Sequence, residues 1–115
     1  MALPRHSPPW YFHNAMARIH QYWVYILSND GHSVFYIGVT NDLYRRILEH
    51  RAMEDEEAFT GRYRVLKLVY YERYQWINEA IAREKKLKKW KREWKVALIN
   101  ELNPGWKGLL SEFEI

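Results

Sequence analysis

The sequence predicts an α+β domain, in which a three-stranded, mostly antiparallel sheet is flanked by helices in the order ββαβαα. Two observations predict this class. Short apolar runs at 23–27 and 34–37 are separated by a polar segment that contains Asn-Asp-Gly, a spacing typical of a β-hairpin. Residues 75–103 contain no proline or glycine, so they can form one long bent helix or two helices. Paired strands together with separate helices are the pattern of an α+β domain.

The first run predicts the central strand of the sheet. Side chains alternate along a strand, so Trp23, Tyr25 and Leu27 share one face, whereas Val24 and Ile26 share the other. Both faces are apolar, which indicates a strand that is covered on both sides.

The segment after the hairpin predicts a helix over residues 41–53. Thr40–Asp42 supplies side chains that can accept hydrogen bonds from free N–H groups at the helix start. Leu43 and Ile47 lie four residues apart and are expected to face the core. A third strand is predicted over 65–71, which is rich in β-branched and aromatic residues.

Glu84 is the most informative residue of the helical stretch that follows. It falls on an apolar stripe formed by Ile77, Ile81, Leu87 and Trp90. Burying an unpaired charge is costly, so an inward carboxylate needs a partner. The partner is either a cation such as Arg46, which the spacing alone favours, or a hard divalent metal ion. Glu79 and Arg83, four residues apart, are expected to pair on the polar side of the same helix.

Residues 83–95 contain eight basic and two acidic side chains, with Trp90 and Trp94 one turn apart. Three interpretations are open: a solvated charged face, a basic amphipathic helix for a membrane surface or a calmodulin-like partner, or a groove that follows a phosphate backbone. We favour the groove, because the same helix carries Glu84, and tryptophans can stack on bases. The candidate nucleic-acid-binding residues are Lys85, Lys88, Lys89, Trp90, Lys91 and Arg92, with Arg45 from the first helix.

Length and composition set broader limits. The 115 residues suit one domain, predicted over 21–110, with a flexible N-terminal arm over 1–20 and a short tail over 111–115. The net charge of +4 favours a polyanionic partner. Cysteine is absent, which excludes disulfides and zinc sites built on thiolates. No apolar run reaches the roughly 18 residues of a membrane helix, and no signal peptide is recognisable, so we expect a cytoplasmic protein without a membrane partner.

A set of short motifs resembles the N-terminal half of the GIY-YIG nuclease domain, as found in small stand-alone bacterial proteins. The matching residues are Val24-Tyr25-Ile26, Tyr36-Ile37-Gly38, Asn41-Asp42-Leu43, Arg46 and His50. The first triplet has valine where the family name has glycine, whereas the second triplet matches fully. A single Tyr-Ile-Gly is common, but its distance from Tyr25 and the Asn-Asp-Leu, arginine and histidine that follow make the resemblance fairly specific. It extends to Glu84 and Asn103, and so covers about 22–110.

The resemblance implies the fold described above and a metal-dependent nuclease. Tyr25 and Tyr36 would flank the attacking water, and one of them would take its proton. A phenol has a pKa near 10 and is a poor base unless a cation such as Arg46 lowers it. Arg46, which the register favours over Arg45, would hold the scissile phosphate. Glu84 would bind Mg²⁺ or Mn²⁺.

The roles of two further residues stay open. His50 could act as a base, an acid or a hydrogen-bond donor to phosphate, although a single histidine is more often structural. Asn103 matches a family asparagine near the end of the domain, but Asn-Pro is also an ordinary helix stop.

We therefore expect an endonuclease that hydrolyses DNA phosphodiester bonds, in single-stranded or branched DNA, during repair, recombination or other DNA processing. The main alternative is a non-catalytic nucleic-acid-binding module of the same fold. The presence of tyrosine, arginine and glutamate together favours the enzyme.

Overall fold

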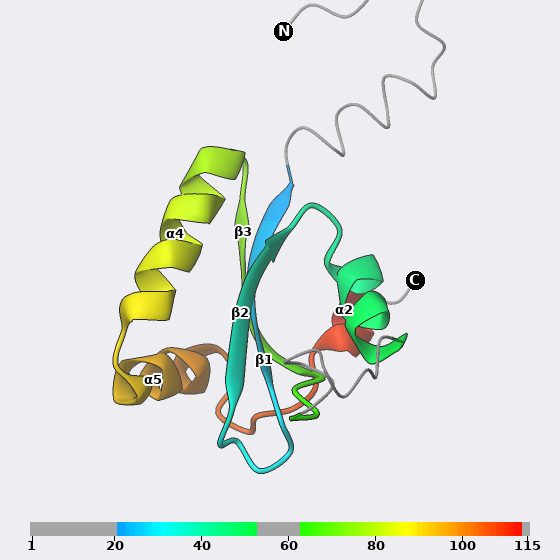
Figure 1. Ribbon diagram of the computed structural model, residues 1–115, viewed down its shortest axis with the longest axis vertical. Helices are drawn as coiled ribbons and strands as arrows, with labels where there is room; N and C mark the ends of the chain where they lie inside the picture. Colours follow the sequence, from blue (N-terminus) through cyan, green and yellow to red (C-terminus); the bar gives the residue numbers. More distant parts are fainter. Residues whose placement is uncertain (1–20, 53–62, 114–115) are drawn as a thin grey trace, which may run out of the picture.

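The computed structural model describes residues 21–52 and 63–113, and Figure 1 shows the arrangement of their elements. The expected arm over 1–20 lies outside the described residues. The elements, in chain order, are β1 (Tyr22–Ser28), β2 (Phe35–Thr40), α2 (Leu43–Ala52), β3 (Lys67–Tyr74), α4 (Ile77–Lys89), α5 (Arg92–Leu102) and the 3₁₀ helix η1 (Leu110–Phe113). The predicted α+β class and the order ββαβαα are confirmed, with η1 added at the end. No helix in these described ranges is long and apolar enough to span a membrane.

The sheet has the order β2-β1-β3, and both strand pairs are antiparallel. β1 is therefore the central strand, as its two apolar faces predicted. In the β1–β2 pair, Tyr25 lies opposite Gly38, and in the β1–β3 pair it lies opposite Tyr71. This register places the tyrosine of the first triplet beside the glycine of the second.

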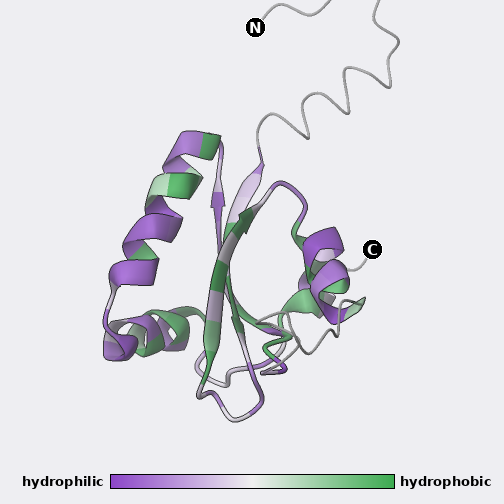
Figure 2. Cartoon of the chain, viewed as in Figure 1, coloured by the Kyte–Doolittle hydropathy of each residue, from purple (hydrophilic) through white to green (hydrophobic). Residues whose placement is uncertain are grey.

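The alternation of β1 builds a separate core on each face of the sheet. Val24 and Ile26 pack with buried residues of α4 and α5, namely Ala80, Leu87 and Ile99. Tyr25 and Leu27 pack on the other face, with Leu43 and Ile47 of α2. Figure 1 shows α4 and α5 on one side of the sheet and α2 on the other. In Figure 2, the mostly hydrophilic α4 contrasts with the more hydrophobic strands that it covers.

The stretch from 75 to 103 forms two helices, which was one of the two predicted possibilities. Trp90 and Lys91 have extended ψ angles of 147° and 152°, so the helical ladder is interrupted between α4 and α5. Arg92 fixes the start of α5 against the hairpin loop. Its guanidinium donates to the carbonyl oxygens of His32 and Ser33 and lies 4.5 Å from the ring centroid of Phe35.

The chain beyond α5 runs back along β3. The N–H of Leu109 donates to the carbonyl oxygen of Leu68 at 2.8 Å. The ring centroid of Phe113 then lies 5.2 Å from that of Trp23 and 4.9 Å from that of Tyr71. The described structure thus continues through η1 to residue 113, and η1 packs beside β1 and β3 through Phe113.

Arg83 pairs with a different carboxylate from the one predicted. Its Nε and Nη2 atoms donate to Glu72 of β3 at 2.9 Å each, so the expected pair with Glu79 is wrong. Tyr70 and Tyr74 also donate to Glu72. Burial alone would raise the pKa of Glu72, but the bonds from Arg83, Tyr70 and Tyr74 outweigh it and hold the pKa below its ordinary value of 4.5. This network joins α4 to the edge strand β3.

We expect this network to make stability depend on acid pH. Because the pKa of Glu72 is lower in the folded state, its contribution is present above about pH 4.5 and is lost as the pH falls through the folded pKa. Arg83→Met should cost about 2–3 kcal/mol of unfolding free energy, less than for a fully buried pair, because both side chains are partly exposed.

Urea unfolding of the wild type, Glu72→Gln and Glu79→Gln between about pH 6 and pH 3 measures this effect. Glu79→Gln should follow the wild type, whereas Glu72→Gln should lose less stability on acidification. Parallel curves for all three proteins would contradict the assignment.

Candidate active site

Three ring side chains meet on the face of the sheet that α2 covers. Tyr25 of β1 is fully buried, and its Oη lies 3.0 Å from Nε2 of His50, which is also buried. The ring of Tyr36 on β2 lies 5.1 Å from that of His50 and 6.2 Å from that of Tyr25, centroid to centroid. The predicted residues Tyr25, Tyr36 and His50 therefore form one cluster.

Gly38 makes room for this cluster. A Cβ atom built on Gly38 would lie 2.5 Å from Oη and 2.6 Å from Cζ of Tyr25, closer than any side chain tolerates. The phenol of Tyr25 thus lies against the bare backbone of the edge strand β2. The glycine of the Tyr-Ile-Gly triplet is required by this close approach and not by its backbone angles, because its φ is not positive.

Arg46 lies one turn before His50 on α2, as the four-residue spacing predicted. Its side chain is 35% exposed, and Nη1 donates to Oε2 of Glu49 at 3.0 Å. Glu49 was not singled out from the sequence, although its three-residue spacing from Arg46 is a recognisable signal. The positive charge of Arg46 also favours the phenolate form of Tyr25 and so lowers its pKa. A cation is thereby held at the edge of the tyrosine cluster.

Tyr25 and His50 are both neutral at physiological pH. Burial, followed by the nearby Tyr36, raises the pKa of Tyr25 to about 12, although Arg46 opposes the shift. Burial, followed by the charge of Arg46, lowers the pKa of His50 below its ordinary value of 6.5. A neutral phenol therefore faces a neutral imidazole across 3.0 Å, a distance at which a proton can pass between them.

Glu84 faces inward, but for a different reason from the one predicted. Ile77 and Ile81 are 50% and 38% exposed, so the apolar stripe assigned to them is wrong. The buried positions of α4 are Ala80 and Leu87, and Glu84 lies half-buried on that side of the helix, between them.

The ionic partner of Glu84 also differs from the one considered. Oε1 of Glu84 lies 3.4 Å from Nζ of Lys88, whereas Arg46 pairs with Glu49. The negative charge of Glu84 nevertheless contributes to the raised pKa of Tyr25, as the smallest of the causes. α4 contacts both β1 and β2. Glu84 thus lies on a helix that covers the face of the sheet opposite α2.

Asn103 has a structural role in this fold. Its Nδ2 donates to the carbonyl oxygens of Val69 at 3.0 Å and Lys107 at 2.9 Å, and its Oδ1 accepts from the N–H of Lys107 at 3.0 Å. The side chain is buried at the C-terminal cap of α5. These bonds give Asn103 a structural role at the end of α5, and its catalytic role stays a prediction.

The predicted nucleic-acid-binding residues have different environments. Lys85, Lys88, Lys89 and Lys91 are exposed along α4 and the break that follows it. Trp90 is partly buried against the core, with the guanidinium carbon of Arg83 5.0 Å from its ring centroid. Trp94, which is 52% exposed, is the accessible ring of the two.

The two arginines of this set are already engaged. Arg92 holds the hairpin loop, as described above. Nε of Arg45 lies 4.0 Å from Oδ2 of Asp42 and 3.6 Å from Oε1 of Glu49. Their charges are therefore partly satisfied within the protein.

Carboxylate and imidazole side chains do not gather into a ready-made metal cage. Within 21–52 and 63–113, no group of three or more histidine, cysteine, aspartate or glutamate side chains is placed to hold a metal ion. A single carboxylate such as Glu84 is compatible with Mg²⁺, which commonly retains several waters and takes its other ligands from a substrate phosphate.

Comparison with known proteins gives a consistent family. Residues 21–97 match the model of the GIY-YIG catalytic domain. A UPF0213 protein of Haloquadratum walsbyi is 36% identical over 80 residues, which cover 70% of this chain and 88% of the relative. A UPF0213 protein of Bacillus pumilus is 31% identical over 83 residues, 72% of this chain and 83% of the relative. The solution NMR structure of a UPF0213 protein from Bacillus halodurans is 27% identical, with a TM-score of 0.49, and the match covers 76% of this chain and 92% of that one.

Gly38→Ala tests whether the cluster depends on the bare backbone of β2. The new methyl group must displace the ring of Tyr25, which is fully buried, so the variant should lose about 1–3 kcal/mol of stability. The matched control is Gly31→Ala, because a Cβ on Gly31 meets no atom within 4 Å. Thermal unfolding of both variants measures the difference, and equal melting temperatures would contradict the steric argument.

Proposed function

This chain belongs to the GIY-YIG catalytic domain family, and on that premise we propose that it is a metal-dependent endonuclease that hydrolyses DNA phosphodiester bonds. The observation that carries the proposal is the cluster of Tyr25, Tyr36 and His50, with Arg46 one turn before His50 on α2. Glu84 comes from α4, on the other face of the sheet. A cation, a carboxylate and a proton-transfer group are the components that phosphodiester hydrolysis requires.

In the proposed mechanism, Tyr25 and His50 together remove the proton of the attacking water. With a pKa near 12, Tyr25 alone is a poor base at neutral pH. His50 is neutral and hydrogen-bonded to it, so Tyr25 can take the water proton while its own proton moves to Nε2 of His50. Tyr36 lies beside both rings and is only partly buried, which suits it to hold the water or a phosphate oxygen.

Arg46 is proposed to stabilise the charge that develops on the phosphoryl oxygens. Its guanidinium fork matches phosphate geometry, and its side chain remains accessible despite the pair with Glu49. Because Glu49 is itself 44% exposed, a phosphate can compete for Arg46 without leaving a buried charge unpaired.

Glu84 is proposed to hold Mg²⁺ or Mn²⁺, to which one carboxylate, water and substrate phosphate would supply the ligands. When bound, such an ion would stabilise the leaving oxygen. Lys88, which pairs with Glu84 at 3.4 Å, is more than half exposed and can move away from the carboxylate.

We further propose single-stranded or branched DNA as the substrate and DNA repair, recombination or processing as the setting. The exposed lysines at 85, 88, 89 and 91 support a polyanionic substrate.

Glu84→Gln separates catalysis from folding and from binding alone. The amide is a much weaker ligand for a hard cation, so cleavage should fall by roughly 10²-fold or more, while DNA binding holds or improves. Stability should stay close to the wild type, because the only ionic partner of Glu84 in the described residues is the exposed Lys88.

Glu101→Gln, on an exposed position of α5, is the matched control and should cut normally. Cleavage of labelled single-stranded, duplex and branched DNA, with magnesium, manganese or a chelator, is measured beside thermal unfolding. Normal cutting by Glu84→Gln, or a wild type that binds DNA without cutting any substrate, would favour the non-catalytic binding module.

The proton-transfer role of His50 predicts a specific pH profile. Cleavage should need neutral His50, so the rate should fall as the pH drops through its lowered pKa, below 6.5, and should be level near pH 7. Tyr25→Phe removes the hydroxyl that links water to His50 and should lower the rate by roughly 10²–10⁴-fold. His50→Gln should be slow and should lose the acidic limb. An unchanged limb in His50→Gln would assign that titration to another group.

A further inference from the structure

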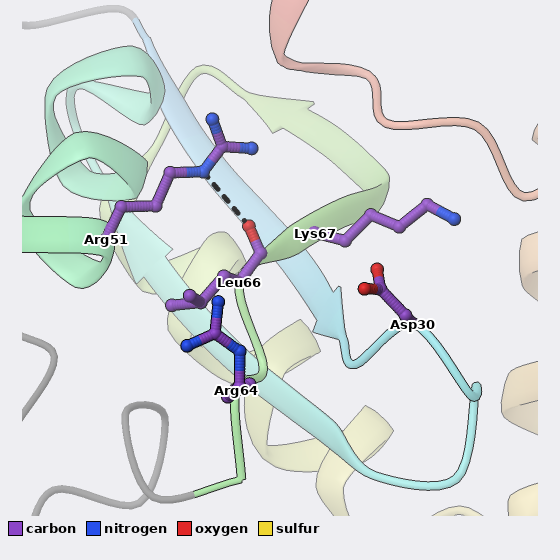
Figure 3. Close-up of a pocket in the computed structure, with 5 residues that line it drawn as sticks. All are labelled: Asp30, Arg51, Arg64, Leu66 and Lys67. Atoms are coloured by element: carbon purple, nitrogen blue, oxygen red, sulfur yellow. Dashed lines mark hydrogen bonds between the residues drawn. The ribbon is translucent and has the colours of Figure 1, made fainter. Parts of the chain in front are cut away.

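A basic hollow at the end of α2 lies outside the cluster described above. It has a volume of about 240 Å³ and is lined by Asp30, Arg51, Arg64, Leu66 and Lys67. Figure 3 shows these side chains around the start of β3, with Arg51 reaching in from α2. We propose that this hollow binds a phosphate group of the DNA strand, about two nucleotides from the phosphate that is cleaved. The inference rests on the proposed function and specifies where its substrate runs.

The positive side chains of the hollow come from different segments of the chain. Arg51 belongs to the last turn of α2, Arg64 precedes β3, and Lys67 is the first residue of β3. Nε of Arg51 donates to the carbonyl oxygen of Leu66 at 3.3 Å, which leaves both terminal nitrogens of its fork for another acceptor. Such a fork is suited to the paired oxygens of a phosphate.

Two of the three cations of the hollow lack an ion-pair partner among the described residues. Three cationic side chains and one carboxylate give a net charge of +2. Among the residues that the structure describes, Arg51 and Lys67 have no ion-pair partner, and Asp30 pairs with no cation. The contrast with Arg45 and Arg46 on the same helix, which both pair with Glu49, indicates that this positive charge is available to an external anion.

The position of the hollow relates it to the candidate active site. Arg51 follows His50 directly and lies five residues after Arg46 on α2. At 1.5 Å per residue, that separation is about 7.5 Å along the helix axis. It corresponds to about two nucleotides, at roughly 3.4 Å per nucleotide of one strand. A strand whose scissile phosphate meets Arg46 can therefore place a nearby phosphate at Arg51.

The double variant Arg51→Gln/Lys67→Gln tests the proposal, with Arg73→Gln/Lys107→Gln as its control. Both remove two positive charges, and the control residues are exposed and lie outside the hollow. The equilibrium constant for a labelled single-stranded oligonucleotide is measured in chelator as a function of salt. The hollow variant should bind about tenfold more weakly than the control variant. Its slope of log K against log salt should be shallower by about 0.7 for each phosphate lost. Equal affinity and slope in the two variants would overturn the inference.

Asp30→Asn gives a test of the opposite sign that needs no loss of a basic side chain. Removing the negative charge from the hollow should tighten binding several-fold, because a carboxylate beside a bound phosphate is repulsive. Unchanged or weaker binding by Asp30→Asn would count against the inference, even if the double variant were poorly folded.

Cleavage assays with magnesium separate this inference from the proposed function. If the wild type cuts DNA and the hollow variant binds like its control, the hollow has no role although the nuclease assignment stands. If the wild type binds but never cuts, and the hollow variant loses affinity, the phosphate site stands without the catalytic proposal. A wild type that binds no DNA would overturn both.

Discussion

The fit of Tyr25 against Gly38 is the constraint on which the candidate active site depends. Tyr25 lies on the central strand, is fully buried and has its hydroxyl 3.0 Å from His50, so α2, β1 and β2 are fixed relative to one another around one phenol. Its ring occupies the space that any side chain at Gly38 would fill. Because interiors are close-packed, a displacement of this ring would be transmitted to Leu43 and Ile47 as well as to the hydroxyl.

The opposite face of the sheet is held by polar contacts of two buried or partly buried side chains, Glu72 and Asn103. Glu72 accepts from Arg83, Tyr70 and Tyr74, and Asn103 joins α5 to β3 and to the chain after it. Partly and fully buried polar groups of this kind are costly unless every partner is present, so they favour one arrangement of the helices over its alternatives. Glu84 therefore projects from a helix whose position is set by neighbours distant from the cluster.

The sequence was sufficient for features that depend on periodicity and on local turns. Alternation identified β1 as a central strand, and the four-residue spacing of Arg46 and His50 placed both on one flank of α2. It was not sufficient for contacts between elements. Arg83 has several carboxylates near it in the sequence. Its pairing with Glu72 depends on how α4 packs against β3, which the sequence pattern does not reveal. From the sequence, Asn103 could be either a catalytic residue or a helix stop. Its hydrogen bond to the carbonyl oxygen of Val69 depends on how α5 packs on β3.

The burial of Tyr25 limits how the cluster can work. Desolvation penalises the phenolate, so a tyrosine that must become a base on its own would be better placed at the surface. Here the phenol is hydrogen-bonded to an imidazole whose own pKa is lowered by the same burial and by Arg46, and the two shifts keep the pair neutral until a proton moves. A neutral pair leaves Arg46 without a competing anion on the tyrosine, and its charge is then opposed mainly by the exposed Glu49. Burial of the cluster and accessibility of Arg46 are thus complementary: the first keeps the proton carriers uncharged, and the second reserves the positive charge for an anionic substrate.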